Sequence, residues 1–113
     1  MEVREYLSND GRCPFTEWML ALRDIDARAR ILVRLNRVRL GNPGDCKAVG
    51  EGVWELRIPR GAGYRVYFAR PTRACILLLC GGDKGSQRRD INKAKRYWKD
   101  YQEQGDAQKP NLR

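Results

Sequence analysis

The chain has 113 residues, enough for one domain with a modest hydrophobic core and too few for a second. Its 23 basic and 14 acidic residues give a formal charge of +9, which favours a polyanion or an acidic protein as partner. The longest apolar run, residues 74–80, is too short to cross a bilayer, and the first residues do not resemble a signal peptide. We therefore expect a cytoplasmic protein without membrane contact.

The residues that most often bind metals or transfer protons are scarce in this sequence. There is no histidine, and the four cysteines are spaced unlike any zinc-binding pattern. We predict no metal site and no cofactor, and expect reduced, mostly structural cysteines. Proton transfer then depends on lysine, aspartate, glutamate, tyrosine or arginine.

The N-terminal part predicts a strand followed by two helices. Residues 2–8 alternate between apolar and polar side chains, and turn residues follow them. Pro14 is suited to begin a short amphipathic helix. Asp24 is suited to cap a second helix, which Gly41 ends. The buried stripe expected on this second helix comprises Ile31, Leu32, Leu35 and Val38.

Three arginines of the second helix share a face separate from this stripe: Arg30, Arg34 and Arg37. A solvated polar face is one interpretation. The other is a docking surface for nucleic acid or for an acidic partner segment. The sequence leaves both open.

After residue 45 the hydrophobic period changes from that of a helix to that of a strand. Residues 53–58 and 64–69 alternate, and residues 74–80 form an unbroken apolar run typical of a central strand covered on both faces. Short turns join these runs, so we predict an antiparallel meander. A last amphipathic helix begins near Arg89.

The predicted fold is a single two-layer α+β domain at residues 1–101. An N-terminal strand and two helices pack on the antiparallel meander, and a C-terminal helix closes over it. Residues 102–113 contain few apolar side chains and are expected to form a flexible tail.

The strand alternation places four polar side chains on one face of two neighbouring strands: Glu55, Arg57, Arg65 and Tyr67. A surface ion pair of Glu55 with one arginine is the structural interpretation, and such pairs contribute little to stability. The functional interpretation is a cationic site, since unpaired charges are expensive to bury.

The segment LLLCGGDKGSQRRDI, residues 77–91, runs from the apolar strand into charged residues. Gly81 and Gly82 allow close backbone approach to a ligand such as phosphate, and Lys84 would then join the two strand arginines around it. An ordinary strand-to-helix turn capped by Asp83 or Ser86 explains the same residues equally well.

Four segments together resemble the RelE/ParE superfamily of bacterial toxins: WMLALRDIDARARI, GDCKAVGEGVWELRI, GYRVYF and LLLCGGDKGSQRRDINKAK. The resemblance covers residues 1–101 and is strongest to HigB-like addiction module killer proteins, including phage-derived Gp49-like proteins. It implies a RelE-like fold and a toxin held inactive by a helix-turn-helix, HigA-like antitoxin.

The resemblance leaves the target of such a toxin open. RelE-like and HigB-like members cut mRNA on the ribosome without a metal ion, and this ribosome-dependent endoribonuclease activity is our leading hypothesis. ParE-like members inhibit DNA gyrase without cutting nucleic acid. A third possibility is a non-toxic module that only binds an antitoxin. Fold does not decide among them.

When the roles of the family's residues are transferred to the matching positions of this sequence, the resemblance implies roles for individual residues. The catalytic set would be Arg57, Arg65, Lys84 and Asp90, with Arg65 stabilising the phosphate and Lys84 acting as base or as a charge. The RNA-binding set would be Lys47, Tyr67, Gln87, Arg88 and Arg89. Arg30, Arg34 and Arg37 would dock the antitoxin or the ribosome. The proton donor stays open among Asp90, Gln87 and Tyr67, because Glu55 stands where RelE-type enzymes carry a basic residue.

Overall fold

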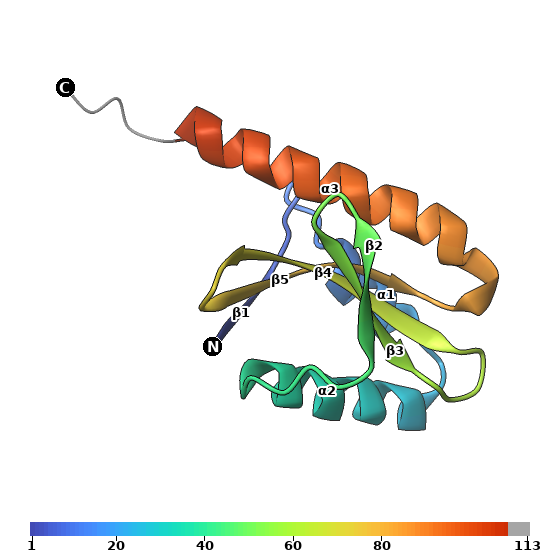
Figure 1. Cartoon of the computed structure of the whole chain (residues 1–113). Helices are drawn as coiled ribbons and strands as arrows, with labels where there is room; N and C mark the ends of the chain where they lie inside the picture. Colours follow the sequence, from blue (N-terminus) through green and yellow to red (C-terminus); the bar gives the residue numbers. More distant parts are fainter. Residues whose placement is uncertain (109–113) are drawn as a thin grey trace.

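The computed structural model describes residues 1–108 as a five-stranded sheet with helices on both faces (Figure 1). The strands are β1 (Glu2–Glu5), β2 (Cys46–Gly50), β3 (Val53–Ile58), β4 (Tyr64–Thr72) and β5 (Cys75–Gly82). The helices are α1 (Pro14–Ala21), α2 (Ile25–Arg39) and α3 (Gln87–Gln108), with the short 3-10 helix η1 (Lys84–Ser86) before α3. Within this part of the chain, no helix has the length and apolar character that a membrane span requires.

The predicted α+β fold with an antiparallel meander and a C-terminal helix is confirmed. The strand order is β1-β5-β4-β3-β2, in which β2 to β5 form the meander and β1 adds parallel to β5. Strand β2 was not expected from the sequence. Its hairpin to β3 depends on Gly50 and Gly52, which flank Glu51, because all three have positive φ.

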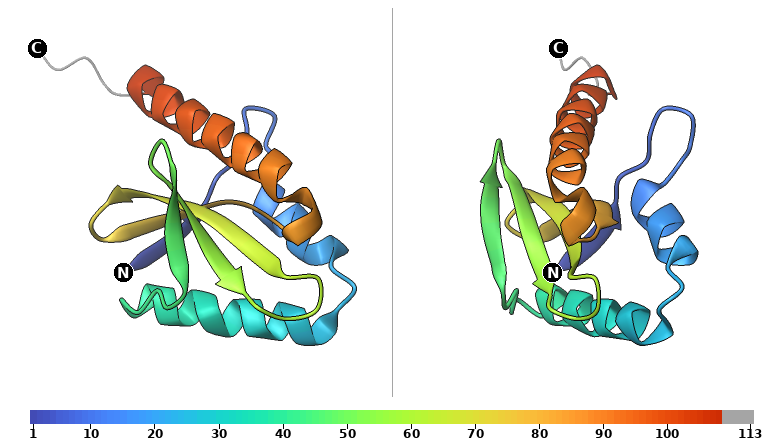
Figure 2. Two further views of the ribbon diagram at one scale, coloured as in Figure 1. Left: turned by 45° about the vertical axis from the view of Figure 1, so that its right-hand side comes forward. Right: turned by 90° about the vertical axis from the view of Figure 1, so that its right-hand side faces the viewer.

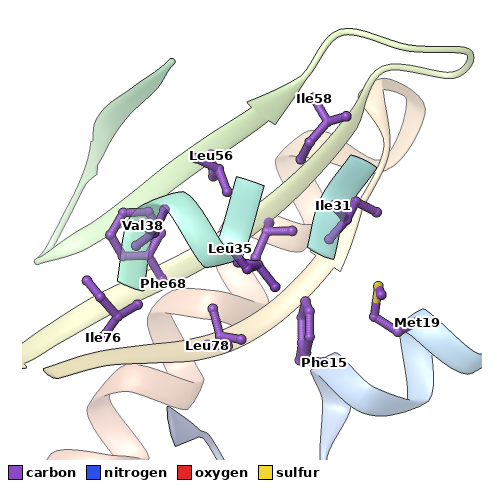
Figure 3. Close-up of a cluster of buried hydrophobic side chains, with 11 residues drawn as sticks. Phe15, Met19, Ile31, Leu35, Val38, Leu56, Ile58, Phe68, Ile76 and Leu78 are labelled. Carbon is purple, nitrogen blue, oxygen red and sulfur yellow. The ribbon is translucent and has the colours of Figure 1, made fainter. Parts of the chain in front are cut away.

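Helices cover both faces of the sheet, so the predicted two-layer arrangement is corrected to three layers. Figure 2 shows α3 and α2 on opposite sides of the strands. The face toward α1 and α2 carries the larger core (Figure 3), which comprises Phe15, Met19, Ile31, Leu35, Val38, Leu56, Ile58, Val66, Phe68, Ile76 and Leu78. Strand alternation predicts which side chains share a face, but not which face each helix takes.

The ends and buried face of α2 follow its sequence with one exception. Asp24 caps the helix as predicted, since its Oδ1 accepts from the Ala27 backbone N–H at 3.0 Å. Leu32, expected in the buried stripe, is 57% exposed. Ala27 is buried in its place, so the stripe is Ala27, Ile31, Leu35 and Val38.

Helix α3 packs on the other face, over a second core of Tyr6, Val53, Tyr67, Ala69, Leu77, Leu79, Cys80 and Ala94. The helix continues past Tyr101 to Gln108, so the predicted tail is wrong for residues 102–108. Gln104 explains part of this extension, because its side-chain N–H donates to Asp100 at 2.7 Å and to Leu7 O at 3.4 Å. Residues 109–113, the rest of the expected tail, lie outside the described residues.

Candidate active site

A fully buried carboxylate, that of Glu55 in β3, lies on the sheet face toward α3. Three neutral or charged donors reach it: Tyr67 Oη at 3.0 Å, Gln87 Nε2 at 2.8 Å and Arg57 Nε at 3.2 Å. Arg65 Nε lies 3.5 Å from the same carboxylate and forms an ion pair with it. Glu55 is thus the centre of a network that joins β3, β4 and the start of α3.

The strand register explains why these side chains meet. Glu55 pairs with Lys47 of β2 on one side and with Tyr67 of β4 on the other. Two residues farther along β3, Arg57 pairs with Arg65 of β4. Side chains of directly paired residues point to the same face, so these two rows present their charges together.

Lys84 joins these rows from the start of η1. Its backbone N–H donates to Ala62 O in the β3–β4 turn at 3.2 Å. A Cβ added to Gly63 would lie 3.4 Å from both Arg65 Nη1 and Lys84 Cβ, so these two side chains flank the same glycine. We call Lys47, Arg57, Arg65 and Lys84 the cationic face: Arg57 and Arg65 pair with Glu55, Lys47 is its neighbour on β2, and Lys84 lies beside Arg65.

The network decides the charge of Glu55. Burial is the largest single influence on the pKa of this carboxyl and would raise it, but the hydrogen bonds from Gln87 and Arg57 lower it. The Tyr67 hydrogen bond and the Arg65 charge act in the same direction, so the pKa is below its ordinary value. Glu55 is therefore ionised at neutral pH, and its charge offsets part of the arginine charge beside it.

The surface ion pair considered from the sequence is therefore wrong in one respect, because Glu55 is buried and not at the surface. The two arginines differ in exposure: the Arg57 side chain is 37% exposed and the Arg65 side chain 13%. Arg65 is further fixed by donating from Nη1 to Gly63 O at 2.8 Å. Arg65 is held in place while Arg57 remains open to solvent.

Tyr67 does not fit its predicted role as an RNA contact or proton donor. Its side chain is fully buried, and its hydroxyl donates to Glu55. Burial, followed by the Glu55 charge, raises the pKa of Tyr67, so the hydroxyl keeps its proton. Gln87 likewise donates its side-chain N–H to Glu55. Both residues position the carboxylate.

The two glycines that end β5 are required by contacts within the chain, not by an open rim for a phosphate. A Cβ on Gly81 would lie 2.2 Å from the Trp18 ring, on the α1 side of the sheet. A Cβ on Gly82 would lie 1.8 Å from Asp90 Oδ2, on the α3 side. The close approach predicted at this position is made by the protein's own side chains.

The turn after these glycines has the capped geometry that the sequence allowed as an alternative. Asp83 caps η1, and its side chain and that of Ser86 form a reciprocal capping box. The Ser86 hydroxyl also donates to Asp90, which is 5% exposed. Asp90 therefore fastens the turn to α3 and is not a free carboxyl on the cationic face.

Two of the three remaining predicted RNA contacts, Arg88 and Arg89, lie at the start of α3. Arg88 and Arg89 are exposed and line a shallow hollow with Asn92, Lys93 and Arg96. Lys47 is exposed on β2 beside Glu55. The structure thus brings Lys47 into the cationic face, whereas Arg88 and Arg89 belong to a neighbouring basic surface.

The three arginines of α2 lie on the opposite side of the sheet, and they do not act alike. Arg30 and Arg37 are exposed, as docking requires. Arg34 instead donates to the backbone carbonyls of Arg57, Pro43 and Asp45, the last two at 3.1 and 3.2 Å. Arg34 therefore ties α2 to the loop before β2, which corrects its predicted docking role.

One central residue of the site was missing from the predicted set. The alternation of β3 places Glu55 in the polar cluster, but nothing in the sequence indicates how many donors converge on it. Among residues 1–108 no group of histidine, cysteine or acidic side chains is arranged to hold a metal ion. The chemistry available at the site is that of fixed cations around a buried carboxylate.

The fold and the site define a small α+β protein with a cationic face on one side of its sheet. The family model of phage-derived Gp49-like proteins matches residues 17–99, so the chain belongs to this family. An uncharacterised protein of Haemophilus influenzae is 46% identical over 81 residues, covering 72% of this chain and 82% of that protein. Family membership is consistent with the toxin of a toxin–antitoxin pair in general.

Proposed function

We propose that the protein is a ribosome-dependent mRNA endoribonuclease, the toxin of a type II toxin–antitoxin system of the HigB-like kind. The observation that carries the proposal is the cationic face itself. Arg65 and Arg57 are aligned by one buried carboxylate, and Lys84 lies beside Arg65. Preorganised cations of this kind stabilise charge that develops on a phosphate during strand cleavage.

The reaction assigned to this face is transesterification by the ribose. The 2′-oxygen forms a bond to phosphorus while the bond from phosphorus to the 5′-oxygen breaks, leaving a cyclic phosphate and a free 5′-hydroxyl. Arg65 and Arg57 bind the phosphate oxygens as their charge increases. This step needs fixed positive charge and two proton transfers, and no redox partner.

The reaction needs a group that accepts the proton of the 2′-hydroxyl and a source of the proton for the leaving 5′-oxygen. Lys84 contacts the phosphate or, in its neutral form, accepts the proton of the 2′-hydroxyl. Asp90 is engaged with Ser86 and buried, so we assign solvent as the proton source for the leaving 5′-oxygen. Orientation of the mRNA by the ribosome would supply much of the rate that weak acid–base groups do not.

Net charge and the neighbouring basic surface support an RNA target. The chain carries a formal charge of +9, and Arg88, Arg89, Lys93 and Arg96 extend the positive surface along α3. Such a surface attracts ribosomal and messenger RNA phosphates irrespective of sequence. The proposal includes a cytoplasmic location and a helix-turn-helix, HigA-like antitoxin as partner.

Primer extension on mRNA from translating ribosomes tests the proposal. We expect cuts with the wild-type protein, and a loss of about 100-fold in cleavage rate with Arg65→Ala. Arg73→Ala is the matched control, because Arg73 is exposed in the turn between β4 and β5. Cleavage should be unchanged in that variant.

Two outcomes would contradict the proposal in different ways. Wild-type cleavage rates with folded Arg65→Ala would exclude the cationic face as the site. No cleavage by the wild-type protein, together with inhibition of gyrase supercoiling, would assign the protein to the gyrase-inhibiting class. If induction caused no growth arrest and no cleavage, the protein would be a module that only binds an antitoxin.

A further inference from the structure

Helix α2 is apolar on two opposite faces, and only one of them is buried in the domain. The outward face carries Ile25, Leu32, Val33 and Leu40, which are 74%, 57%, 52% and 69% exposed. Ala29 and Asn36 are exposed between them, the Asn36 side chain accepting from Arg39 at 2.7 Å, and Leu40 is the C-cap residue of the helix. Successive residues of a helix are rotated by about 100°, which puts these side chains in one stripe along the outer side of α2. A stripe of this length is a candidate contact surface.

Arginines border this stripe on both sides. At helical spacing, Arg28 and Arg39 fall along one edge, and Arg30 and Arg37 fall along the other. Asp26, at the first turn, is paired with Arg60 at 3.0 Å, so its charge is already balanced. The surface is therefore an apolar strip between two positive borders, and we call it the α2 docking face.

A hollow of about 570 Å³ lies beside the strip, between α2 and the end of β3 with the two residues that follow it. Ala29 and Val33 contribute apolar surface from the helix, and Ile58 and Pro59 contribute it from the other side. Arg30 and Arg37 line the same hollow, together with the ion pair of Asp26 and Arg60. Large apolar side chains of a partner have a recess here, with positive charge around it.

We propose that the α2 docking face binds one amphipathic helical segment of another protein, apolar along one side and flanked by aspartate and glutamate. The apolar strip buries the partner's apolar side chains, as in other helix-in-groove complexes. The arginine borders pair with its carboxylates and steer the encounter. Charge complementarity therefore selects an acidic partner.

The same charges argue against the other occupants of this face. A second copy related by twofold symmetry would bring the arginine borders of both chains together. Nucleic acid would satisfy the arginines but would leave the apolar strip in water. Only a partner that is both apolar and acidic matches the whole surface.

The α2 docking face and the cationic face lie on opposite sides of the sheet. Helix α2 packs on the core that contains Leu56 and Val66, whereas Glu55 and Arg65 point toward α3. Figure 1 shows α2 and α3 separated by the strands. A segment bound to α2 therefore leaves the cationic face open, so the inference is independent of the proposed nuclease activity.

The test is a selection from a display library of random 20-residue peptides against the full-length protein, followed by fluorescence anisotropy with the enriched peptides. We expect enriched sequences with leucine-like residues at helical spacing and flanking acidic residues. Leu32→Glu should weaken binding by about tenfold or more, since it puts a like charge against those acids and removes apolar contact. It should not change the fold or mRNA cleavage, because the side chain points to solvent.

The arginine borders give a second readout. Arg30→Gln combined with Arg37→Gln should lower affinity several-fold at low salt and reduce the salt dependence of binding, since exposed charge pairs are screened by ions. Arg65→Ala, on the other side of the sheet, should bind the peptides as the wild type does. That result separates the docking face from the nuclease site whether or not mRNA is cut.

Three results would overturn the inference. The first is that the enriched peptides are basic or lack helical spacing. The second is that Leu32→Glu binds acidic peptides as tightly as the wild type. The third is that the wild-type protein forms dimers in sedimentation and that Leu32→Glu abolishes them. The last result would assign the α2 docking face to a second copy of the chain.

Discussion

The two faces of the sheet are built from the same strands, yet they bury different chemistry. Toward α1 and α2 the buried residues of β3 and β4 are apolar throughout, as Leu56 and Val66 illustrate. Toward α3 the same strands bury Glu55, held by hydrogen bonds and an ion pair. Apolar packing needs only matched shape, whereas a buried charge needs donors fixed from several elements.

Burying the charged network of Glu55 on the α3 face costs stability that the apolar face does not lose. Replacing a buried ion pair by apolar residues is often neutral or stabilising, so such a pair is weak evidence that stability alone is served. Here Glu55 orients Arg65 and Arg57 and also accepts from Gln87, the first residue of α3. On the α3 face, a buried charged network takes the place of apolar packing at this point and holds the cations in alignment.

The largest expected effect comes from removing the carboxylate. Glu55→Ala leaves the poorly exposed Arg65 without its counter-ion, which should lower the free energy of unfolding by about 3 kcal/mol or more. Urea unfolding measures the change. Glu51→Ala is the control, because Glu51 is exposed and lies 3.7 Å from Lys95. That exposed pair should contribute less than about 1 kcal/mol. Equal losses in both variants would remove the contrast between the faces.

Acid should weaken the α3 face in the same way and more gradually. The pKa of Glu55 is below its ordinary value of 4.5 in the folded protein. Its contribution is therefore complete above that value and is lost as the pH falls toward the folded pKa. Glu55→Gln lacks this contribution at every pH. The difference in unfolding free energy between wild type and Glu55→Gln should shrink as the pH is lowered below about 4.5, and a constant difference would contradict this assignment.

Gly81 and Gly82 allow the same substitution to be compared on the two faces. Gly81→Ala drives a methyl group into the Trp18 ring, which itself packs against Phe15. Gly82→Ala meets the shorter side chain of Asp90. We expect losses of about 2–3 kcal/mol for Gly81→Ala and about 1–2 kcal/mol for Gly82→Ala, since overpacking costs more where the neighbour is rigid.

Gly105→Ala is the control for both glycines. Gly105 lies in α3 with no atom near the position of an added Cβ. Because alanine favours a helix over glycine, this variant should gain up to about 1 kcal/mol. Thermal or urea unfolding measures all three variants. A larger loss for Gly82→Ala than for Gly81→Ala would mean that the turn at Asp90 is the more rigid of the two contacts.

Much of this comparison follows from the sequence, because a strand has a period of two. The alternation of β3 and β4 places Glu55, Arg57, Arg65 and Tyr67 on one face, and the structure has them there. The same rule does not reveal that α3 covers this face, so Tyr67 was predicted to contact RNA although it is buried. Burial depends on contacts between distant segments, which local pattern does not encode.

The other errors have equally local causes. Leu32 was predicted to be buried because α2 is apolar on two faces, and spacing alone does not tell which one meets the sheet. The glycines at the end of β5 suggested a ligand, since nothing in the sequence shows that Trp18 and Asp90 approach them. Strand β2 is short and contains one glycine, so its period was too weak to detect.

The smallest expected effect on stability is also the one that best separates function from folding. Lys84 is exposed, and only its backbone N–H holds the β3–β4 turn. Lys84→Ala should therefore change the free energy of unfolding by no more than about 0.5 kcal/mol. On the proposed function it should still lower mRNA cleavage about tenfold or more, because a cation beside the phosphate is lost. Lys99→Ala, farther along the exposed side of α3, should change neither quantity. Cleavage at the wild-type rate in Lys84→Ala would restrict the reactive part of the cationic face to the two arginines that Glu55 aligns.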